Sequence, residues 1–158
     1  MATSIAAPQT AAHAVLTDPR GLVLLVNPAY KKRWHLPGGF VHEGELPSAG
    51  VAREVREELA ITPRLSSAPS VIAWAPHAGD RLLMYYAAKL TPQQAGDVRT
   101  NGHEIVGFRW CDQAALDEWL HPAVAERVRL TLQASRRGQT VFTEPQLGTE
   151  RKSGPHAR

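Results

Sequence analysis

Apolar and polar positions along the chain form short runs that predict strands and helices in alternation. Several apolar runs rich in β-branched and aromatic residues predict strands. They lie at residues 13–16, 22–26, 71–74, 81–90 and 104–110. Between the first two runs, Asp18, Pro19 and Gly21 favour a turn, so these runs are predicted to pair as an antiparallel hairpin. Val141 and Phe142 predict one more short extended piece.

Helical periodicity appears in three segments. In residues 47–60, Val51, Val55 and Leu59 recur every four positions and predict a helix with one buried stripe. Two further helices are predicted at 112–120 and 122–137, because Asp112 can cap the first and Pro122 suits the first turn of the second. The predicted fold class is therefore α/β (α+β), with a mixed β-sheet sandwiched between α-helices.

The composition is that of one globular domain. The chain has 158 residues, of which 43% are apolar and 21% charged, and this suffices for a single hydrophobic core. We predict one domain at residues 11–143, with flexible ends at 1–10 and 144–158. The single cysteine, Cys111, excludes an internal disulfide. Because the first residues also lack a signal peptide, a cytoplasmic location is expected.

The charge distribution argues against nucleic-acid and membrane partners. Two of the three excess positive charges lie in residues 150–158, which we interpret as a solvated tail. No apolar run is long enough to cross a membrane.

The chain also lacks a paired His-x-x-x-His, a Gly-x-Ser-x-Gly elbow and a Gly-Lys-Ser/Thr phosphate loop, which disfavours zinc hydrolase, serine hydrolase and kinase chemistry.

Three glutamates on the predicted helix 47–60 share one face. Glu54, Glu57 and Glu58 are three and four residues apart, so their side chains fall within one arc of the helix. Like charges at this spacing repel, and the cluster therefore indicates either a solvated acidic face or a hard divalent cation that neutralises it. The adjacent Gly38-Gly39 pair favours the cation, because its irregular backbone can approach a ligand closely.

The same residues resemble the signature of the Nudix hydrolases. That signature reads Gly, five residues, Glu, seven residues, Arg-Glu, an apolar residue, any residue, Glu-Glu, any residue, Gly and an apolar residue. The positions in register are Gly39, Glu45, Arg53, Glu54, Val55, Glu57, Glu58 and Ile61. Including segments 34–39 and 104–110, the resemblance covers residues 11–135. The sequence departs from the pattern at Ala60, where glycine is usual, and at His42, where an acidic residue is common.

The resemblance implies hydrolysis of a diphosphate bond with the help of Mg²⁺, or alternatively Mn²⁺. Glu57 and Glu58 would ligate the metal, and Glu54 would bind metal or take the proton of the attacking water. Gly38 would offer its carbonyl oxygen as a further ligand. Arg53 would orient Glu54.

Other residues are expected around this centre. Glu45 would brace the glycine loop against the helix through an ion pair, with Gly39 also in a supporting position. Glu104 is the candidate for a further ligand or base, with an exposed strand-end glutamate as the alternative. The candidate substrate-binding residues are Lys31, Lys32, Arg33, Trp34 and Arg81.

The expected substrate is a small nucleotide derivative, namely a nucleoside triphosphate, an oxidised nucleotide or a nucleotide sugar such as ADP-ribose. Pro76, fifteen residues after Ile61, resembles a mark of members that act on ADP-ribose, although a turn explains it equally well. The alternative function is a Nudix-like domain that senses a nucleotide without cleaving it. The resemblance also allows a homodimer.

Overall fold

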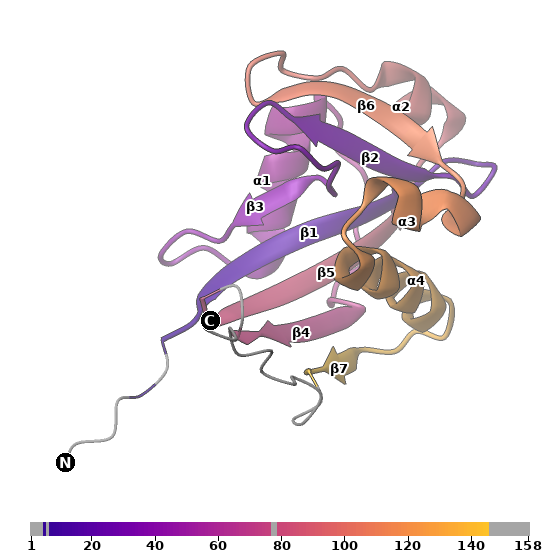
Figure 1. The fold of residues 1–158 in the computed structure, drawn as a ribbon. Coiled ribbons are helices and arrows are strands. Elements are labelled where there is room, and N and C mark those ends of the chain that lie inside the picture. The colour runs from indigo at the N-terminus through magenta and orange to yellow at the C-terminus, as the bar shows by residue number, and fades with distance from the viewer. Residues whose placement is uncertain (1–4, 6, 77–78, 146–158) are drawn as a thin grey trace, which may run out of the picture.

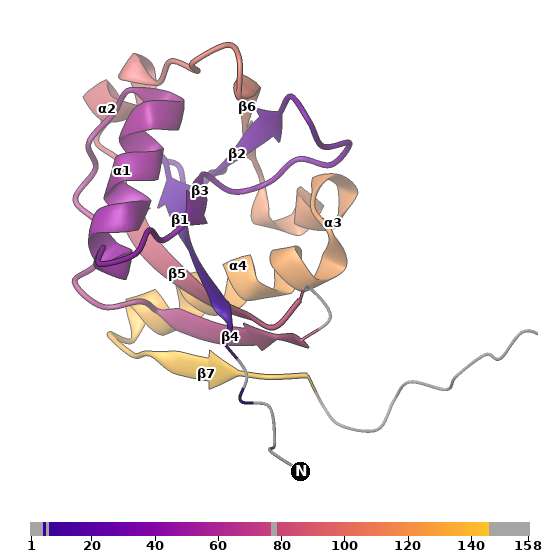
Figure 2. The same ribbon diagram turned by 90° about the vertical axis from the view of Figure 1, so that its left-hand side faces the viewer.

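A computed structural model describes residue 5, residues 7–76 and residues 79–145. It shows a seven-stranded mixed sheet with helices on both faces (Figures 1 and 2), which confirms the predicted fold class. Strand order is β6-β2-β1-β5-β4-β7, and β3 pairs with β1 off this path. The strands are β1 (Gln9–Thr17), β2 (Val23–Pro28), β3 (Gly38–Phe40), β4 (Val71–Ala75), β5 (Arg81–Lys89), β6 (Ile105–Cys111) and β7 (Val141–Thr143).

Helices cover the sheet as their apolar stripes require. They are α1 (Pro47–Leu59), α2 (Pro92–Asp97), α3 (Leu116–Trp119) and α4 (Pro122–Arg136), with a 3-10 turn at Gln113–Ala115 before α3. Val51, Val55 and Leu59 of α1 are fully buried in one hydrophobic cluster. Ala125 and Val128 of α4 are fully buried in a second cluster. The two helices therefore lie on different sides of the sheet (Figure 2).

The β1–β2 hairpin opens a gap in the sheet. Its turn forms as predicted, with the Asp18 carboxylate accepting hydrogen bonds from the backbone N–H groups of Arg20 and Leu22. The two strands pair at Thr17 and Val23 and then diverge. Residues 35–40 fill the space between them, because His35 bridges to Val26 and β3 pairs antiparallel with β1.

Three predictions of local structure need correction. Residues 38–40 were expected to be irregular, but they form β3, since paired glycines allow the backbone to lie directly against β1. The helix α2 is absent from the predicted elements. Its start is marked by a capping box, in which Thr91 and Gln94 exchange side-chain-to-backbone hydrogen bonds. The first strand begins at Gln9, four residues before the predicted apolar run at 13–16, because β1 continues its pairing with β5 to Arg81.

The predicted extended piece at the C-terminal end is present as β7, which pairs parallel with β4. Most of the two predicted flexible ends, residues 1–4, 6 and 146–158, lies outside the described residues. Within the described part of the chain, no helix is long and apolar enough to cross a membrane.

Candidate active site

A cavity of about 410 Å³ lies where β1 and β2 diverge. It is bordered by β1, the loop from β2 to β3, α1, the start of β5, the start of β6 and α4. Seven of the predicted site residues line it, namely Lys31, Gly38, Gly39, Glu54, Glu58, Arg81 and Glu104. The structure thus brings together side chains that are up to 73 positions apart in the sequence (Lys31 to Glu104).

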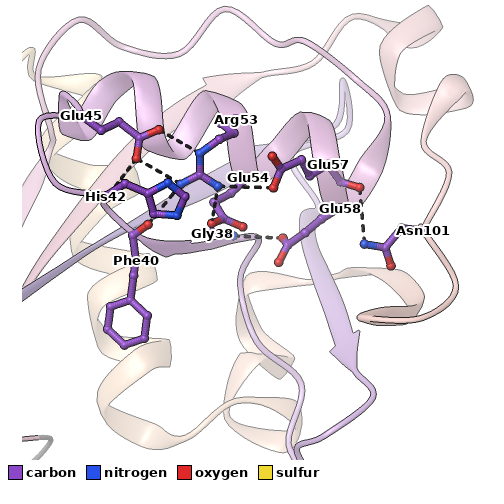
Figure 3. A network of polar contacts seen from close by, with 9 residues as sticks. All are labelled: Gly38, Phe40, His42, Glu45, Arg53, Glu54, Glu57, Glu58 and Asn101. Atoms are coloured by element: carbon purple, nitrogen blue, oxygen red, sulfur yellow. Dashed lines mark hydrogen bonds and ion pairs between the residues drawn. The ribbon is translucent and has the colours of Figure 1, made fainter.

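Arg53 is the centre of a polar network on the face of α1 (Figure 3). Its guanidinium group donates to both carboxylate oxygens of Glu45, at 2.8 and 3.1 Å. It also donates to Glu54 at 2.8 Å, to Glu57 at 3.3 Å and to the carbonyl oxygen of Phe40 at 3.2 Å. One arginine therefore joins the helix to β3 and fixes the orientation of Glu54.

The Glu45 ion pair shapes the charge of this network. Hydrogen bonds from Arg53 and from the backbone N–H of His42 lower the pKa of Glu45 to about 2, and the same contact with Glu45 raises the pKa of Arg53. Both groups therefore stay ionised across the physiological range. The brace that the sequence predicts between loop and helix is present in this geometry.

Glu58 points from α1 into the cavity and is only 3% exposed. Its carboxylate accepts a hydrogen bond from the backbone N–H of Gly38 at 3.1 Å. Burial raises the pKa of Glu58 to about 8, and the charges of Glu54, Glu104 and Glu57 add to this rise, while the Gly38 hydrogen bond opposes it. A carboxylate in this position requires a cation or a proton to offset its charge.

The two glycines allow the helix and the loop to approach each other. A Cβ atom on Gly39 would lie 2.7 Å from a carboxylate oxygen of Glu54. At Gly38, where φ is +139°, a Cβ atom would overlap the carbonyl oxygen of Ala12. Side chains at either position would therefore displace the groups that face the cavity.

Glu104 reaches the cavity from the start of β6. The side-chain oxygen of Asn101 accepts hydrogen bonds from the backbone N–H groups of Glu104 and Ile105, at 3.1 and 2.9 Å. The amide of Asn101 donates to the carbonyl oxygen of Glu57 at 3.5 Å, which ties this loop to α1 (Figure 3). Asn101, which sequence reasoning overlooked, thus positions Glu104 opposite the helix.

The oxygen donors around the cavity suit a hard divalent cation. Glu54, Glu58 and Glu104 offer only carboxylate oxygens, the ligands that Mg²⁺ and Mn²⁺ favour. The described residues contain no group of three acidic, histidine or cysteine side chains already close enough to hold a metal. Glu57 lies outside the cavity lining, with its side chain 52% exposed and bound to Arg53. Metal binding would therefore require these side chains to converge.

Three of the predicted substrate-binding residues lie elsewhere. Lys32 and Arg33 are exposed, and Arg33 donates to the carbonyl oxygen of Leu120 after α3. Trp34 packs edge-on against Trp119, with ring centroids 5.9 Å apart. None of the three lines the cavity, so the structure does not place them at this site.

Several other residues that line the cavity were not among the predicted site residues, although Tyr85 was considered as a residue that stacks on a base, with packing in the core as the alternative. His13, His35 and Tyr85 form a ring cluster, with the His13 centroid 5.0 Å from that of His35 and 5.5 Å from that of Tyr85. Arg127 lines the cavity from α4. The sequence offered two signals for these residues. His13 is a polar residue within an apolar strand, and Arg127 is a charged residue three positions after the apolar Val124 on a predicted helix.

Comparisons with known proteins identify the family of this chain. The sequence model of the NUDIX domain matches residues 7–133, so the chain belongs to the Nudix family, and it is a hydrolase of that class. A comparison with curated proteins found no match.

Solved structures with the same fold include the MutT protein of Methanosarcina mazei Go1, with a TM-score of 0.64, 21% identity and coverage of 85% of this chain and 99% of that one. An ADP-ribose pyrophosphatase of Streptococcus suis 89-1591 has a TM-score of 0.68 and 21% identity, with 88% and 100% covered. An Ap4A hydrolase of C. elegans has a TM-score of 0.63 and 25% identity, with 80% and 96% covered.

Proposed function

We propose that this protein uses Mg²⁺ to hydrolyse the diphosphate bond of a nucleoside diphosphate linked to another group. The proposal rests on one observation: Glu54, Glu58 and Glu104 line the same cavity, beside Gly38 and Gly39 of β3. Nudix hydrolases generally use divalent metal ions. Such an ion would neutralise charge on the diphosphate oxygens and make a bound water more acidic.

The residues of the chain would divide the remaining work. Glu58, Glu54 and Glu104 would hold the cation, with the carbonyl oxygen of Gly38 as a further ligand. Glu54 is also the best-placed acceptor for the proton of the attacking water, because Arg53 holds one of its oxygens and leaves the other free to face the cavity. Glu57 would join the ligands once its side chain leaves Arg53.

The substrate class is a nucleotide-derived small molecule. This proposal is supported by two proteins with the same fold, an ADP-ribose pyrophosphatase and an Ap4A hydrolase. Nucleoside triphosphates, oxidised nucleotides and nucleotide sugars such as ADP-ribose are the candidates to compare. A homodimer, a cytoplasmic location and the absence of a nucleic-acid partner stay predictions from the sequence.

A nucleotide panel with Mg²⁺ or Mn²⁺ tests the proposal when the products are identified by mass. We expect cleavage within the phosphate chain, loss of turnover with EDTA, and loss of turnover in Glu58→Gln. Glu118→Gln is the matched control, because Glu118 is an exposed glutamate on α3. Nucleotide binding without any turnover in the unmodified protein would instead support the sensor function.

A further inference from the structure

The cavity has a basic part as well as an acidic part. Lys31, Arg81 and Arg127 all line it, and they come from the β2–β3 loop, the first residue of β5 and the middle of α4. Among the residues that the structure describes, no carboxylate lies within ion-pair distance of any of the three. Arginine side chains that line a cavity without a carboxylate partner are suited to an anionic ligand.

Two buried polar atoms at this part of the cavity lack a hydrogen-bond partner. They are Nδ1 of His13 and Nε of Arg81. His13 is only 8% exposed, and the Arg81 guanidinium group lies over the Phe40 ring, 5.0 Å from its centroid. Buried polar groups in folded proteins are nearly always satisfied, so two unpaired atoms on residues that line the cavity point to a partner other than the protein, either an ordered water or a ligand.

Three basic side chains lie close to His13. Burial lowers the pKa of His13 well below its usual value, and the nearby charges of Lys31, Arg127 and Arg81 lower it further. The positive charge here comes from the three basic side chains.

The Tyr85 end of the cavity, where Arg127 lies, is two strand spacings from Gly38, and His13 lies between them. Glu58 binds Gly38, Gly38 is paired with His13, and His13 is paired with Tyr85. Arg127 approaches on the Tyr85 side, where its charge opposes the burial-driven rise in the pKa of Tyr85. At about 4.8 Å per strand, Tyr85 lies roughly 10 Å from Gly38 along this row. The two phosphates of one diphosphate lie closer together than that.

We propose that Arg127, Arg81 and His13 bind a second phosphate group of the substrate, distinct from the diphosphate that is cleaved. The inference rests on the proposed function, because that function places the diphosphate at the glutamates. Two arginine forks and a lysine favour a doubly charged phosphate over a neutral base or sugar. The substrate class is therefore a nucleoside diphosphate derivative that also carries a phosphomonoester.

The test uses probe pairs that differ by one phosphomonoester. We would measure kcat/KM in Mg²⁺ for ADP-ribose 2′-phosphate against ADP-ribose, and for coenzyme A against 3′-dephospho-coenzyme A. One charge-assisted contact corresponds to about a tenfold effect, so the phosphorylated member of at least one pair should be preferred about tenfold or more, through KM. Arg127→Gln should abolish this preference, and Arg127→Lys should keep part of it.

Arg137→Gln is the matched control, since Arg137 is exposed at the end of the same helix and should leave the preference intact. Equal losses on both members of a pair in Arg127→Gln would place Arg127 at the cleaved diphosphate and overturn the inference. The absence of any preference in the unmodified protein would overturn it as well.

A binding measurement separates this inference from the proposed function. Thermal stabilisation of the Glu58→Gln variant by each probe reports affinity without turnover. If the unmodified protein cleaves both members of each pair equally, the hydrolase function stands and the second phosphate site is wrong. If no probe is cleaved but the phosphorylated members bind more tightly, the site stands and the hydrolase function is wrong.

Discussion

Replacing Glu58 by glutamine should change how the stability of the metal-free protein depends on pH. The pKa of this buried carboxyl group is about 8 in the folded protein, against an ordinary value of 4.5. The folded state therefore holds the proton more tightly than the unfolded state does. Its contribution to stability is complete below pH 4.5 and is lost as the pH rises toward 8. Glutamine does not titrate, and its side-chain oxygen can still accept the hydrogen bond from Gly38.

The size of the effect follows from the shift in pKa. At about 1.36 kcal/mol per pH unit, the three units between pH 4.5 and pH 7.5 correspond to about 4 kcal/mol at most. Of this, about 3 kcal/mol falls between pH 5 and pH 7.5, because roughly half a unit of the range lies below pH 5. That is a large part of the stability of a typical domain.

Urea unfolding in EDTA at about pH 5 and about pH 7.5 measures this quantity. We expect Glu58→Gln to gain about 3 kcal/mol over the unmodified protein between the two pH values, and the exposed-site variant Glu118→Gln to gain nothing. Parallel pH profiles for the unmodified protein and Glu58→Gln would refute the reasoning. Added Mg²⁺ should stabilise the unmodified protein more at the higher pH, where metal and proton no longer compete for the carboxylate.

Three further substitutions test the surroundings of the site. Ala60 ends α1 with φ +57°, a conformation that favours glycine. Ala60→Gly should therefore raise the free energy of unfolding by about 1 kcal/mol, measured by urea titration, without a large gain in turnover. The control Ala52→Gly, inside α1, should lower the free energy of unfolding by a similar amount. Gly39→Ala should reduce kcat/KM about 100-fold by moving the neighbouring carboxylate, and Gly96→Ala, in open space, should leave it unchanged. Glu104→Gln should weaken metal binding, measured by calorimetry, about tenfold, and an unchanged affinity and rate would remove this residue from the site.

Local sequence patterns were enough to predict the acidic part of the cavity at Glu54 and Glu58. The spacing of Glu54 and Glu58 on one helix, and the glycine pair just before that helix, are both visible within 21 residues of sequence. The helix itself begins at Pro47 as its periodicity predicts, because its apolar stripe has a face of the sheet to cover. Such features depend on contacts between near neighbours in the chain.

Only Lys31 and Arg81 of the basic part of the cavity were predicted from the sequence, and its other residues could not be. His13 and Tyr85 become neighbours only through the parallel pairing of β1 with β5, and a register shift of one residue would place their side chains on opposite faces of the sheet. Arg127 reaches them from a helix more than forty residues further along. Trp34 shows the converse error, because an aromatic residue next to the glycine loop suggested a ligand contact but packs against Trp119.

The position of the cavity follows from how β1 and β2 separate. Because the two strands pair at only one described residue pair, the sheet leaves a gap that β3 enters, and glycines at 38 and 39 keep that gap from being filled by side chains. Glu58 can then lie in the gap, where it gains one hydrogen bond but loses hydration. A better-paired hairpin would close this gap, and a larger residue at position 39 would clash with Glu54. Either change would remove the space in which a cation and a phosphate chain could meet those carboxylates.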